Sequence, residues 1–377
     1  MAMLRRIMLK GYKSIREMDL ELRPLNVMIG TNGAGKSNLI SFFRMLNEMM
    51  QNRSQDHIAI SYGAQSLLYY GPEVTPQMEA RLEFEIAGEH HQNCTYYLRL
   101  SHALGHTPLF DDRLVFAEEK LSFQQNGCGE DPQILSRAAD HEEAHVLDQA
   151  SRGEPTTMAF RQLLDRCRVY HFHDTRSVVG LCHLYNTFRE LEPNGRNLAS
   201  FLYQLKNRDS ALAYHRIVRT IRLMAPFFDD FEFKLLEPDA SILVLNWRDK
   251  ESGQILDAGQ LSDGTLRAIC LLTLLLQPEE NLPDLIIVDE PELGLHPYAV
   301  NLVASLFKRA SHHSQVLIST QSSTFLDHFD PEDIIVVDRE GKESVFRRPD
   351  PVALEAWLDE YSLGEVWEKN VIGGGPH

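Results

Sequence analysis

Cysteine is scarce in this sequence. Five cysteines are spread over 377 residues, and no two of them form a Cys-x-x-Cys pair. This spacing excludes a disulfide framework and a cysteine-based zinc finger, and it suits a chain that folds in a reducing compartment.

Long hydrophobic runs are also missing. The most apolar later segment, residues 268–276, is far shorter than the roughly 18 residues that suggest a membrane span. The N-terminus, MAMLRRIMLKGYKS, has short apolar stretches broken by charge, so it lacks the apolar core and cleavage site of a signal peptide. We therefore expect a cytoplasmic protein that does not use a membrane.

Positive charge is in deficit. The 37 Lys and Arg residues are outnumbered by 54 Asp and Glu residues, which gives a formal net charge of −17. This balance argues against a protein that coats nucleic acid over its whole surface, but it is compatible with a local basic groove. With 43% hydrophobic residues, the composition is that of an ordinary globular protein of one large or two medium domains.

Apolar periodicity predicts several strands and a helix in the first hundred residues. Residues 18–22 alternate apolar and acidic side chains, as a half-buried strand does, and residues 25–29 form a buried strand that runs into glycine. Residues 37–50 carry apolar side chains at helical spacing, and residues 79–86 and 95–100 alternate like an antiparallel pair.

The middle of the chain is less regular. Residues 101–157 are rich in Gly, Asp, Glu and His, and we expect a loop-rich insertion there. Further along, the pattern predicts a strand at 168–173, helices at 198–205 and 211–224, and an antiparallel pair at 231–236 and 242–247.

The C-terminal third predicts an α/β core. A buried helix at 265–276, an amphipathic helix at 297–310, and strands at 285–288, 315–319 and 334–337 are expected. Continuous apolar strands that alternate with helices are typical of a mainly parallel sheet covered on both faces. We therefore expect an N-terminal lobe (1–100) and a C-terminal lobe (235–377) separated by a lid-like insertion (101–234), with no heptad run long enough for a coiled coil.

A phosphate-binding loop is the strongest motif. The run GTNGAGKS at residues 30–37 fits G-x-x-x-x-G-K-[ST] without mismatch, and it lies between a predicted strand and a predicted helix. Backbone N–H groups of such a loop wrap a phosphate, and the glycines let the chain approach closely. Lys36 would neutralise the β and γ oxygens and the Ser37 hydroxyl would hold Mg²⁺, so the chain is predicted to bind a nucleoside triphosphate.

Two adjacent carboxylates end the predicted strand at 285–288. Neighbours on a strand point to opposite sides, so Asp289 can orient the water shell of a metal while Glu290 accepts a proton from an attacking water. A strand that merely ends in a solvated acidic turn is the alternative. LSDGT at residues 261–265 opens the next helix and offers a second anion site at a helix N-terminus, although such a run is often just a helix cap.

Together these motifs resemble the ATP-binding-cassette superfamily, in its non-transporter branch of RecF, SMC proteins and OLD-family ATPases. LSDGT stands where that family has LSGGQ, and DEPELGLHP at 289–297 resembles a run found in its compact stand-alone AAA-type ATPases. GYKSI at 11–15 resembles their GFKS segment, which lines the nucleotide. The resemblance covers roughly residues 1–75 and 235–377. It implies an ABC-type P-loop ATPase head with a mainly parallel sheet, an antiparallel β subdomain and a helical, loop-rich lid, without a Toprim nuclease.

The resemblance implies a shared site. In this family ATP is clamped between the phosphate loop of one subunit and the signature of another, which implies a head-to-tail homodimer. The nucleotide-binding residues would be Lys13, Ser14, Asn32, Gly33, Ala34, Gly35, Lys36, Ser37 and Asn38, and the signature residues acting in trans would be Leu261, Ser262, Asp263 and Gly264. Ser37 and Asp289 would hold Mg²⁺, and Gln65 is a candidate for the glutamine that senses it, in competition with Gln51, Gln55 and Gln92.

One residue departs from the family pattern. After the strand at 315–319 the family usually places a switch histidine, whereas this chain has Gln321. An amide can bond a γ-phosphate but cannot become cationic. We therefore expect slow turnover, suited to a switch rather than a motor.

Histidine and arginine patterns suggest two weaker sites. HEEAH at 141–145 fits the H-E-x-x-H zinc pattern, but its polar surroundings are more typical of a solvated helix. His171 and His173 are interpreted as lying on one face of a strand, with a metal-binding role as the alternative. The best basic cluster comprises Lys206, Arg208, Arg216, Arg219 and Arg222, which form either a solvated helix face or a contact with a DNA or RNA backbone.

Two functions follow as hypotheses. In the first, the protein is an ATP-driven switch in DNA repair or anti-phage defence, which acts on nucleic acid or controls a separately encoded nuclease or toxin. In the second, it is an ATP-dependent scaffold that holds an effector protein without touching nucleic acid.

Overall fold

The structure is a computed structural model that describes residues 2–50, 63–86, 92–104, 112–125, 133–141, 144, 150, 155–179, 182–183, 190–207, 211–235 and 242–375. The chain forms two compact units. The first comprises residues 1–169, 284–287 and 314–377, and the second comprises residues 170–283 and 288–313.

An antiparallel sheet makes up much of the first unit. Its strands lie in the order β2-β1-β4-β5-β6-β7. They are β1 (Ala2–Tyr12), β2 (Ile15–Glu21), β4 (Gln77–Ile86), β5 (Gln92–Leu104), β6 (Asp112–Gln125) and β7 (Gln133–His141). Alternate side chains of β1 and β4 are buried, because successive residues of a strand point to opposite faces. The predicted antiparallel pairing of residues 79–86 with 95–100 is confirmed.

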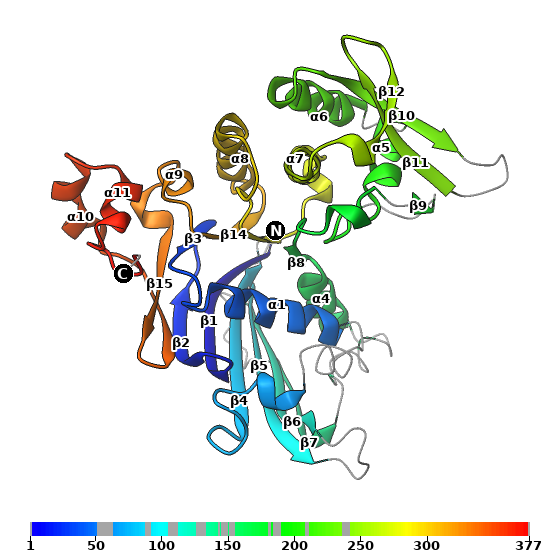
Figure 1. Ribbon diagram of the computed structural model, residues 1–377. Helices are drawn as coiled ribbons and strands as arrows, with labels where there is room; N and C mark the ends of the chain where they lie inside the picture. Colours follow the sequence, from blue (N-terminus) through cyan, green and yellow to red (C-terminus); the bar gives the residue numbers. More distant parts are fainter. Residues whose placement is uncertain are drawn as a thin grey trace. The chain divides into compact units, whose positions relative to one another are not determined.

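Two helices cover the buried face of this sheet. They are α1 (Lys36–Met50) and α4 (Pro155–Asp165), and Figure 1 shows α1 crossing the strands. Apolar side chains of α1, among them Leu39 and Phe42, share one hydrophobic core with Leu9 and Leu82 of the sheet. This packing fixes the helix that follows the phosphate loop.

The expected loop-rich insertion at residues 101–157 is wrong for the described part of that range. β5 runs to Leu104, and β6 and β7 extend the sheet. The register shifts between Arg99 and Leu100 of β5, and again between Phe116 and Glu118 of β6. A bulge interrupts the two-residue period, so the apolar alternation that would have predicted these strands is broken. The division at residues 100 and 234 therefore differs from the observed one, because β6 and β7 extend the sheet of the first unit.

A second sheet carries the phosphate loop. Its order is β16-β15-β3-β14-β13-β8. The strands are β3 (Leu25–Ile29), β8 (Cys167–Tyr170), β13 (Leu285–Asp289), β14 (Gln315–Thr320), β15 (Ile334–Glu340) and β16 (Glu343–Arg347). β3 pairs in parallel with both β14 and β15, and β15 and β16 form an antiparallel hairpin. β3 and β14 are buried along their whole length, which explains their continuous apolar runs.

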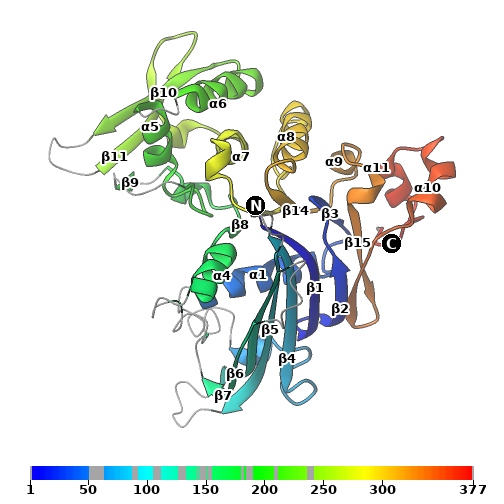
Figure 2. The same cartoon turned by 180° about the vertical axis from the view of Figure 1, so that it is seen from behind.

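Three short helices gather beside β15 at the C-terminal end of the first unit (Figure 2). They are α9 (Ser323–Leu326), α10 (Pro351–Leu358) and α11 (Leu363–Glu368). The backbone N–H of Gly364 donates to Asp327 Oδ1 at 2.6 Å, which joins α11 to the end of α9. Apolar periodicity in the sequence predicts no element beyond residue 337.

The second unit combines helices with a small sheet. Its helices are α5 (Leu198–Asn207), α6 (Ala211–Met224), α7 (Asp263–Leu276) and α8 (Pro297–Ala310). Its strands are β9 (Cys182–His183), β10 (Phe228–Leu235), β11 (Ile242–Asp249) and β12 (Ile255–Asp257), and β11 pairs with the other three. The predicted pair at 231–236 and 242–247 is confirmed with longer strands. None of the described helices is long and apolar enough to cross a membrane.

Single turns of 3-10 helix complete the described elements. They are η1 (Ala64–Ser66), η2 (Thr175–Ser177), η3 (Ala258–Gln260), η4 (Glu279–Asn281) and η5 (Pro331–Asp333).

Candidate nucleotide-binding site

The loop between β3 and α1 has the glycine conformations of an anion-binding loop. Gly33 and Gly35 have φ values of 80° and 115°, a region that side chains disfavour. A Cβ on Gly35 would lie 2.0 Å from Ser344 Oγ, so only glycine fits there. Such a loop aims backbone N–H groups into its concave side, which is the chemistry of an anion site at a helix N-terminus.

Lys36 is held inside this loop. Its side chain is 5% exposed, and Nζ donates to the carbonyl oxygens of Gly30 at 2.6 Å and Thr31 at 3.1 Å. These bonds satisfy a buried ammonium group and fix it at the loop. An arriving phosphate therefore meets a positive charge that is already in position.

The turn at residues 11–15 supports the same loop. Ser14 Oγ accepts a hydrogen bond from Asn38 Nδ2 at 2.6 Å and is 2.6 Å from Ser344 Oγ. Lys13 has a φ of 49°, and burial, with a smaller contribution from the charge of Arg44, lowers the pKa of its ammonium group. The turn named by the resemblance thus lies directly against the start of α1.

The segment at residues 63–71 runs beside that turn. Lys13 N donates to Leu67 O at 2.9 Å and Tyr69 N donates to Gly11 O at 3.0 Å. Gln65 lies in η1 of this segment and is exposed. Of its competitors, Gln92 begins β5, whereas Gln51 and Gln55 lie outside the described residues.

Gln321 and two residues of the phosphate loop line the same cavity, which has a volume of 590 Å³. It is lined by Thr31, Asn32, Gln321, Ser323, Trp367 and Glu368. Thr31 and Asn32 follow β3, and Gln321 follows the neighbouring parallel strand β14. Ligands of open parallel sheets bind at this edge, beyond the carboxyl ends of the strands.

The acidic pair lies where the chain has entered the second unit. Asp289 ends β13, and Glu290 follows with a φ of 47°. A left-handed conformation is costly for a residue with a side chain and is found mainly where the surrounding structure needs it. Leu293 N donates to Glu290 O at 3.2 Å, and the backbone turns toward α8.

The LSDGT turn packs against the loop that follows the acidic pair. Ser262 caps α7 by accepting a hydrogen bond from Thr265 N, and Asp263 accepts one from Thr175 Oγ1 at 2.5 Å. A Cβ on Gly264 would lie 2.2 Å from the carbonyl oxygen of Gly294. The two motifs therefore form one packed block within the second unit.

Sequence comparisons agree with these motifs. Residues 170–327 match a family model described as AAA domain, putative AbiEii toxin, Type IV TA system. The DNA replication and repair protein RecF of Renibacterium salmoninarum is 38% identical over 85 residues, which is 22% of this chain and 21% of that protein. RecF of Porphyromonas gingivalis is 30% identical over 142 residues, 33% of this chain and 39% of that protein. The chain thus spans about a fifth and two fifths of the length of these relatives.

Solved structures show the same fold over nearly the whole chain. The match to an SMC head bound to the C-winged helix domain of ScpA covers 94% of this chain and 99% of that chain, with a TM-score of 0.56 and 15% identity. An SMC head with an extended coiled coil, bound to the C-terminal domain of ScpA from Pyrococcus furiosus, covers 96% and 99%, with a TM-score of 0.55 and 13% identity. The chain has the fold of an SMC head, and parts of its sequence are similar to RecF. The expected fold class is confirmed.

Four residues of the head's first unit border the phosphate loop without having been predicted. Ser344 contacts Gly35, and Arg339 Nη1 donates to the carbonyl of Gly33 at 3.1 Å. Trp367 and Glu368 line the cavity. These residues come from β15, β16 and α11, and no sequence motif marks them.

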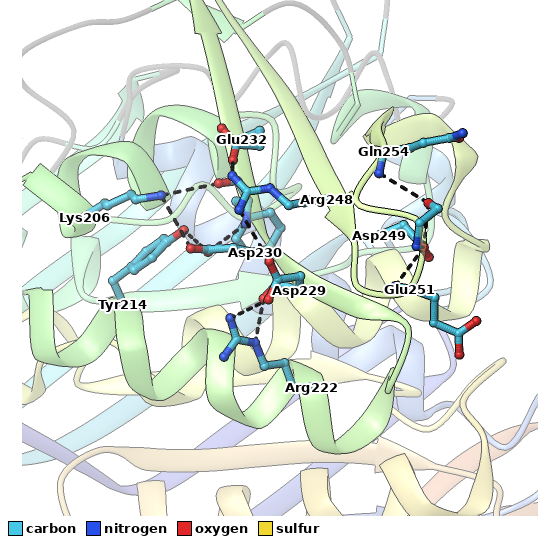
Figure 3. Close-up of polar contacts among 12 residues, drawn as sticks. Lys206, Tyr214, Arg222, Asp229, Asp230, Glu232, Arg248, Asp249, Glu251 and Gln254 are labelled. Atoms are coloured by element: carbon cyan, nitrogen blue, oxygen red, sulfur yellow. Dashed lines mark hydrogen bonds and ion pairs between the residues drawn. The ribbon is translucent and has the colours of Figure 1, made fainter.

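The predicted basic cluster of the head is partly neutralised by acids (Figure 3). Lys206 Nζ lies 3.7 Å from Asp230 Oδ2, and Arg222 Nη2 lies 3.1 Å from Asp229 Oδ1. Arg216 and Arg219 are exposed on α6, and neither makes an ion pair among the described residues. Arg208 lies outside the described residues. A nucleic-acid contact at this surface stays a prediction, and it now depends mainly on Arg216 and Arg219.

The histidine patterns of the head differ from the expected elements. β8 ends at Tyr170, so His171 and His173 follow the strand instead of lying on it. His141 ends β7, which excludes a helix at that residue, and Glu142, Glu143 and His145 lie outside the described residues. Within the described ranges, no group of three His, Cys, Asp or Glu side chains is arranged to hold a metal ion.

Proposed function

We propose that this head binds and slowly hydrolyses ATP with Mg²⁺, and that it works as a nucleotide-controlled switch. The observation that carries the proposal is a cavity that Gln321 lines together with Thr31 and Asn32 of the phosphate loop, the loop in which Lys36 is buried. The positive φ values of Gly33 and Gly35 support a phosphate ligand, since this conformation lets successive backbone N–H groups point at one anion.

Phosphate binding would use groups that are already placed. The N–H groups of residues 33–36 would bond the β-phosphate, and Lys36 would exchange its bonds to Gly30 and Thr31 for phosphate oxygens. Gln321 would donate its amide to the γ-phosphate. An amide leaves that phosphate without the extra positive charge of a histidine, which favours slow turnover.

Hydrolysis would use the acidic pair. Ser37 and Asp289 would hold Mg²⁺, with Gln65 as a further candidate ligand, and the ion would neutralise charge on the phosphates. Glu290 would accept a proton from the water that attacks the γ-phosphorus. The bond between that phosphorus and the bridging oxygen then breaks, and ADP and phosphate are released.

One chain would supply only half of each closed site. We propose that Ser262, at the N-terminus of α7, faces the γ-phosphate bound to the Lys36 of a second copy. Ser262 is exposed and caps a helix whose N–H groups and dipole favour an anion. ATP would thereby hold a head-to-tail dimer together, and hydrolysis would open it.

The biological role proposed is DNA repair or anti-phage defence. Two curated relatives are named for DNA replication and repair, and the matched family model is described as a toxin of a type IV system. The head would act on nucleic acid or control a separately encoded nuclease or toxin. A regulatory scaffold without nucleic-acid contact is the second candidate, which the net charge of −17 and the ion pairs of Lys206 and Arg222 favour.

The mass of the Glu290→Gln variant in solution tests the switch. Glutamine preserves size but cannot accept the proton, so ATP with Mg²⁺ should double the mass. Ser262→Arg in the same background should abolish the doubling, whereas Ser252→Arg, at another exposed serine of the second unit, should leave it intact. A mass that does not change when ATP is added would contradict the ATP-dependent dimer. Rapid ATP turnover by the wild-type protein would contradict a slow switch.

Two further measurements separate the candidate roles. Binding of the purified protein to DNA that weakens steeply with salt would support action on nucleic acid. Stable co-purification with an effector protein, without DNA binding, would support the scaffold.

A further inference from the structure

The C-terminal segment, residues 363–375, is built into the wall of the cavity at the phosphate loop. Trp367 and Glu368 line that cavity together with Thr31, Asn32 and Gln321. Thr31 also contributes the carbonyl that accepts from Lys36 Nζ at 3.1 Å. One residue of the cavity wall therefore holds the ammonium group that would neutralise the β and γ oxygens of ATP.

One anchor of this segment lies beside Gln321. Gly364, in α11, is so close to α9 that a Cβ on it would lie 2.4 Å from the carbonyl oxygen of Ser323. Gly364 N also donates to Asp327 Oδ1 at 2.6 Å. Because α9 begins at Ser323, two residues after Gln321, these contacts join α11 to the segment that carries Gln321.

A second anchor lies beside Gly30, the first residue of the phosphate loop. Trp367 is 5% exposed, and its Nε1 donates to Gly374 O at 2.9 Å. Gly374 N donates to Asp338 Oδ2 at 3.1 Å, and a Cβ on Gly374 would lie 3.6 Å from Gly30 Cα. The segment thus spans the space between Gln321 and the first residue of the loop. Packing on both sides holds the backbone of this segment at the cavity, and the side chain of Glu368 is exposed there.

We propose that this segment is part of the nucleotide site and that the carboxylate of Glu368 selects against a triphosphate relative to a diphosphate. The inference rests on the proposed function. The additional phosphate of ATP would bring its negative charge to the cavity that Glu368 lines, and two negative charges in one cavity repel each other. ADP lacks that phosphate, so its affinity depends less on Glu368.

Nucleotide titrations of the full chain test this selection. ATP and ADP binding are measured with Mg²⁺ by calorimetry in a Glu290→Gln background, which would prevent hydrolysis. Glu368→Gln should tighten ATP binding by about threefold to tenfold and change ADP binding by less than about twofold. Glu360→Gln is the matched control, because Glu360 is exposed in the same unit and does not line the cavity. Equal effects of the two substitutions, or weaker ATP binding by Glu368→Gln, would overturn the inference.

Lys36→Ala separates this inference from the proposed function. If Lys36→Ala binds ATP as tightly as the parent protein, the phosphate-loop assignment itself fails. If Lys36→Ala loses binding while Glu368→Gln behaves like Glu360→Gln, only the role of Glu368 fails.

Tryptophan fluorescence gives a second readout for the segment. ATP should change the emission of the parent protein, and the change should be lost in Trp367→Phe and kept in Trp357→Phe, whose side chain is exposed on α10. A change that survives Trp367→Phe would place the nucleotide away from α11 and contradict the proposed wall.

Discussion

The carbonyl oxygen of Gly294 lies against the α-carbon of Gly264, where a Cβ would approach it to 2.2 Å. The same two loops are joined by Arg267, which donates to Leu293 O at 3.1 Å. The LSDGT turn and the loop after Glu290 are therefore packed directly against each other through backbone contact.

Gly264→Ala should destabilise the protein by about 2–3 kcal/mol, because the neighbouring backbone has to shift to admit the methyl group. Gly253→Ala is the control in the same unit. Its φ of 68° predicts a loss of about 1 kcal/mol from backbone strain, and no atom lies near the added carbon. Urea denaturation compares the two, and equal losses would contradict the close packing.

Glu290→Gly should raise stability while it removes hydrolysis. Glycine relieves the left-handed strain at a φ of 47°, which outweighs its greater chain entropy by about 0.5–1 kcal/mol. Glu290→Gln should also lose hydrolysis but keep the wild-type stability. Denaturation and phosphate-release assays on both variants check this, and a Gly variant less stable than wild type would refute the strain.

Gln321→His should accelerate hydrolysis. A charged donor makes a hydrogen bond to phosphate that is stronger by about 1 kcal/mol, which corresponds to about fivefold in rate. Because imidazole is cationic only below its pKa, the gain should be larger at about pH 6 than at about pH 8. Phosphate release by both proteins, measured across that pH range, tests this prediction. A gain in rate that does not depend on pH would argue against the cationic contact.

Arg216→Ala with Arg219→Ala should weaken any DNA binding more than Lys206→Met with Arg222→Met. The second pair is already engaged with Asp230 and Asp229 (Figure 3), whereas the first has no acidic partner among the described residues. Loss of two phosphate contacts should lower the slope of log affinity against log salt by about 2. Titrations at several salt concentrations measure this. An equal effect of both pairs would show that the ion pairs do not withhold Lys206 and Arg222 from DNA, and no effect of the first pair would remove Arg216 and Arg219 from the interface.

ATP binding should take up protons at alkaline pH. The pKa of Lys13 is lowered by burial and by Arg44, so part of the ammonium population is neutral as the pH rises toward that pKa. A bound phosphate favours the charged form and raises the pKa again, so the complex holds more protons than the free protein. Calorimetry in two buffers of different ionisation enthalpy measures the uptake. Lys13→Arg, which stays charged, should bind ATP without it, and an unchanged uptake would exclude Lys13.

The phosphate loop and its two strands were predictable from sequence because their requirements are local. A nest of N–H groups needs glycine at residues such as 33 and 35, whose φ values are positive, and a buried parallel strand needs a continuous apolar run. The α/β class and the pairing of β4 with β5 followed from the same short-range periodicities. The roles of Ser262, Asp289 and Glu290 stay predictions that the variants above test.

Only the tertiary structure showed what surrounds that loop. Ser344 and Glu368 are more than 300 residues from Gly33, and their positions depend on how β16 and α11 pack. The same holds for β6, whose bulges hide its alternation, and for Lys206, whose charge is offset by an acid from another element. A backbone conformation restricts the residues that adopt it and so marks the sequence, whereas a contact between distant segments is fixed only by strand register and packing.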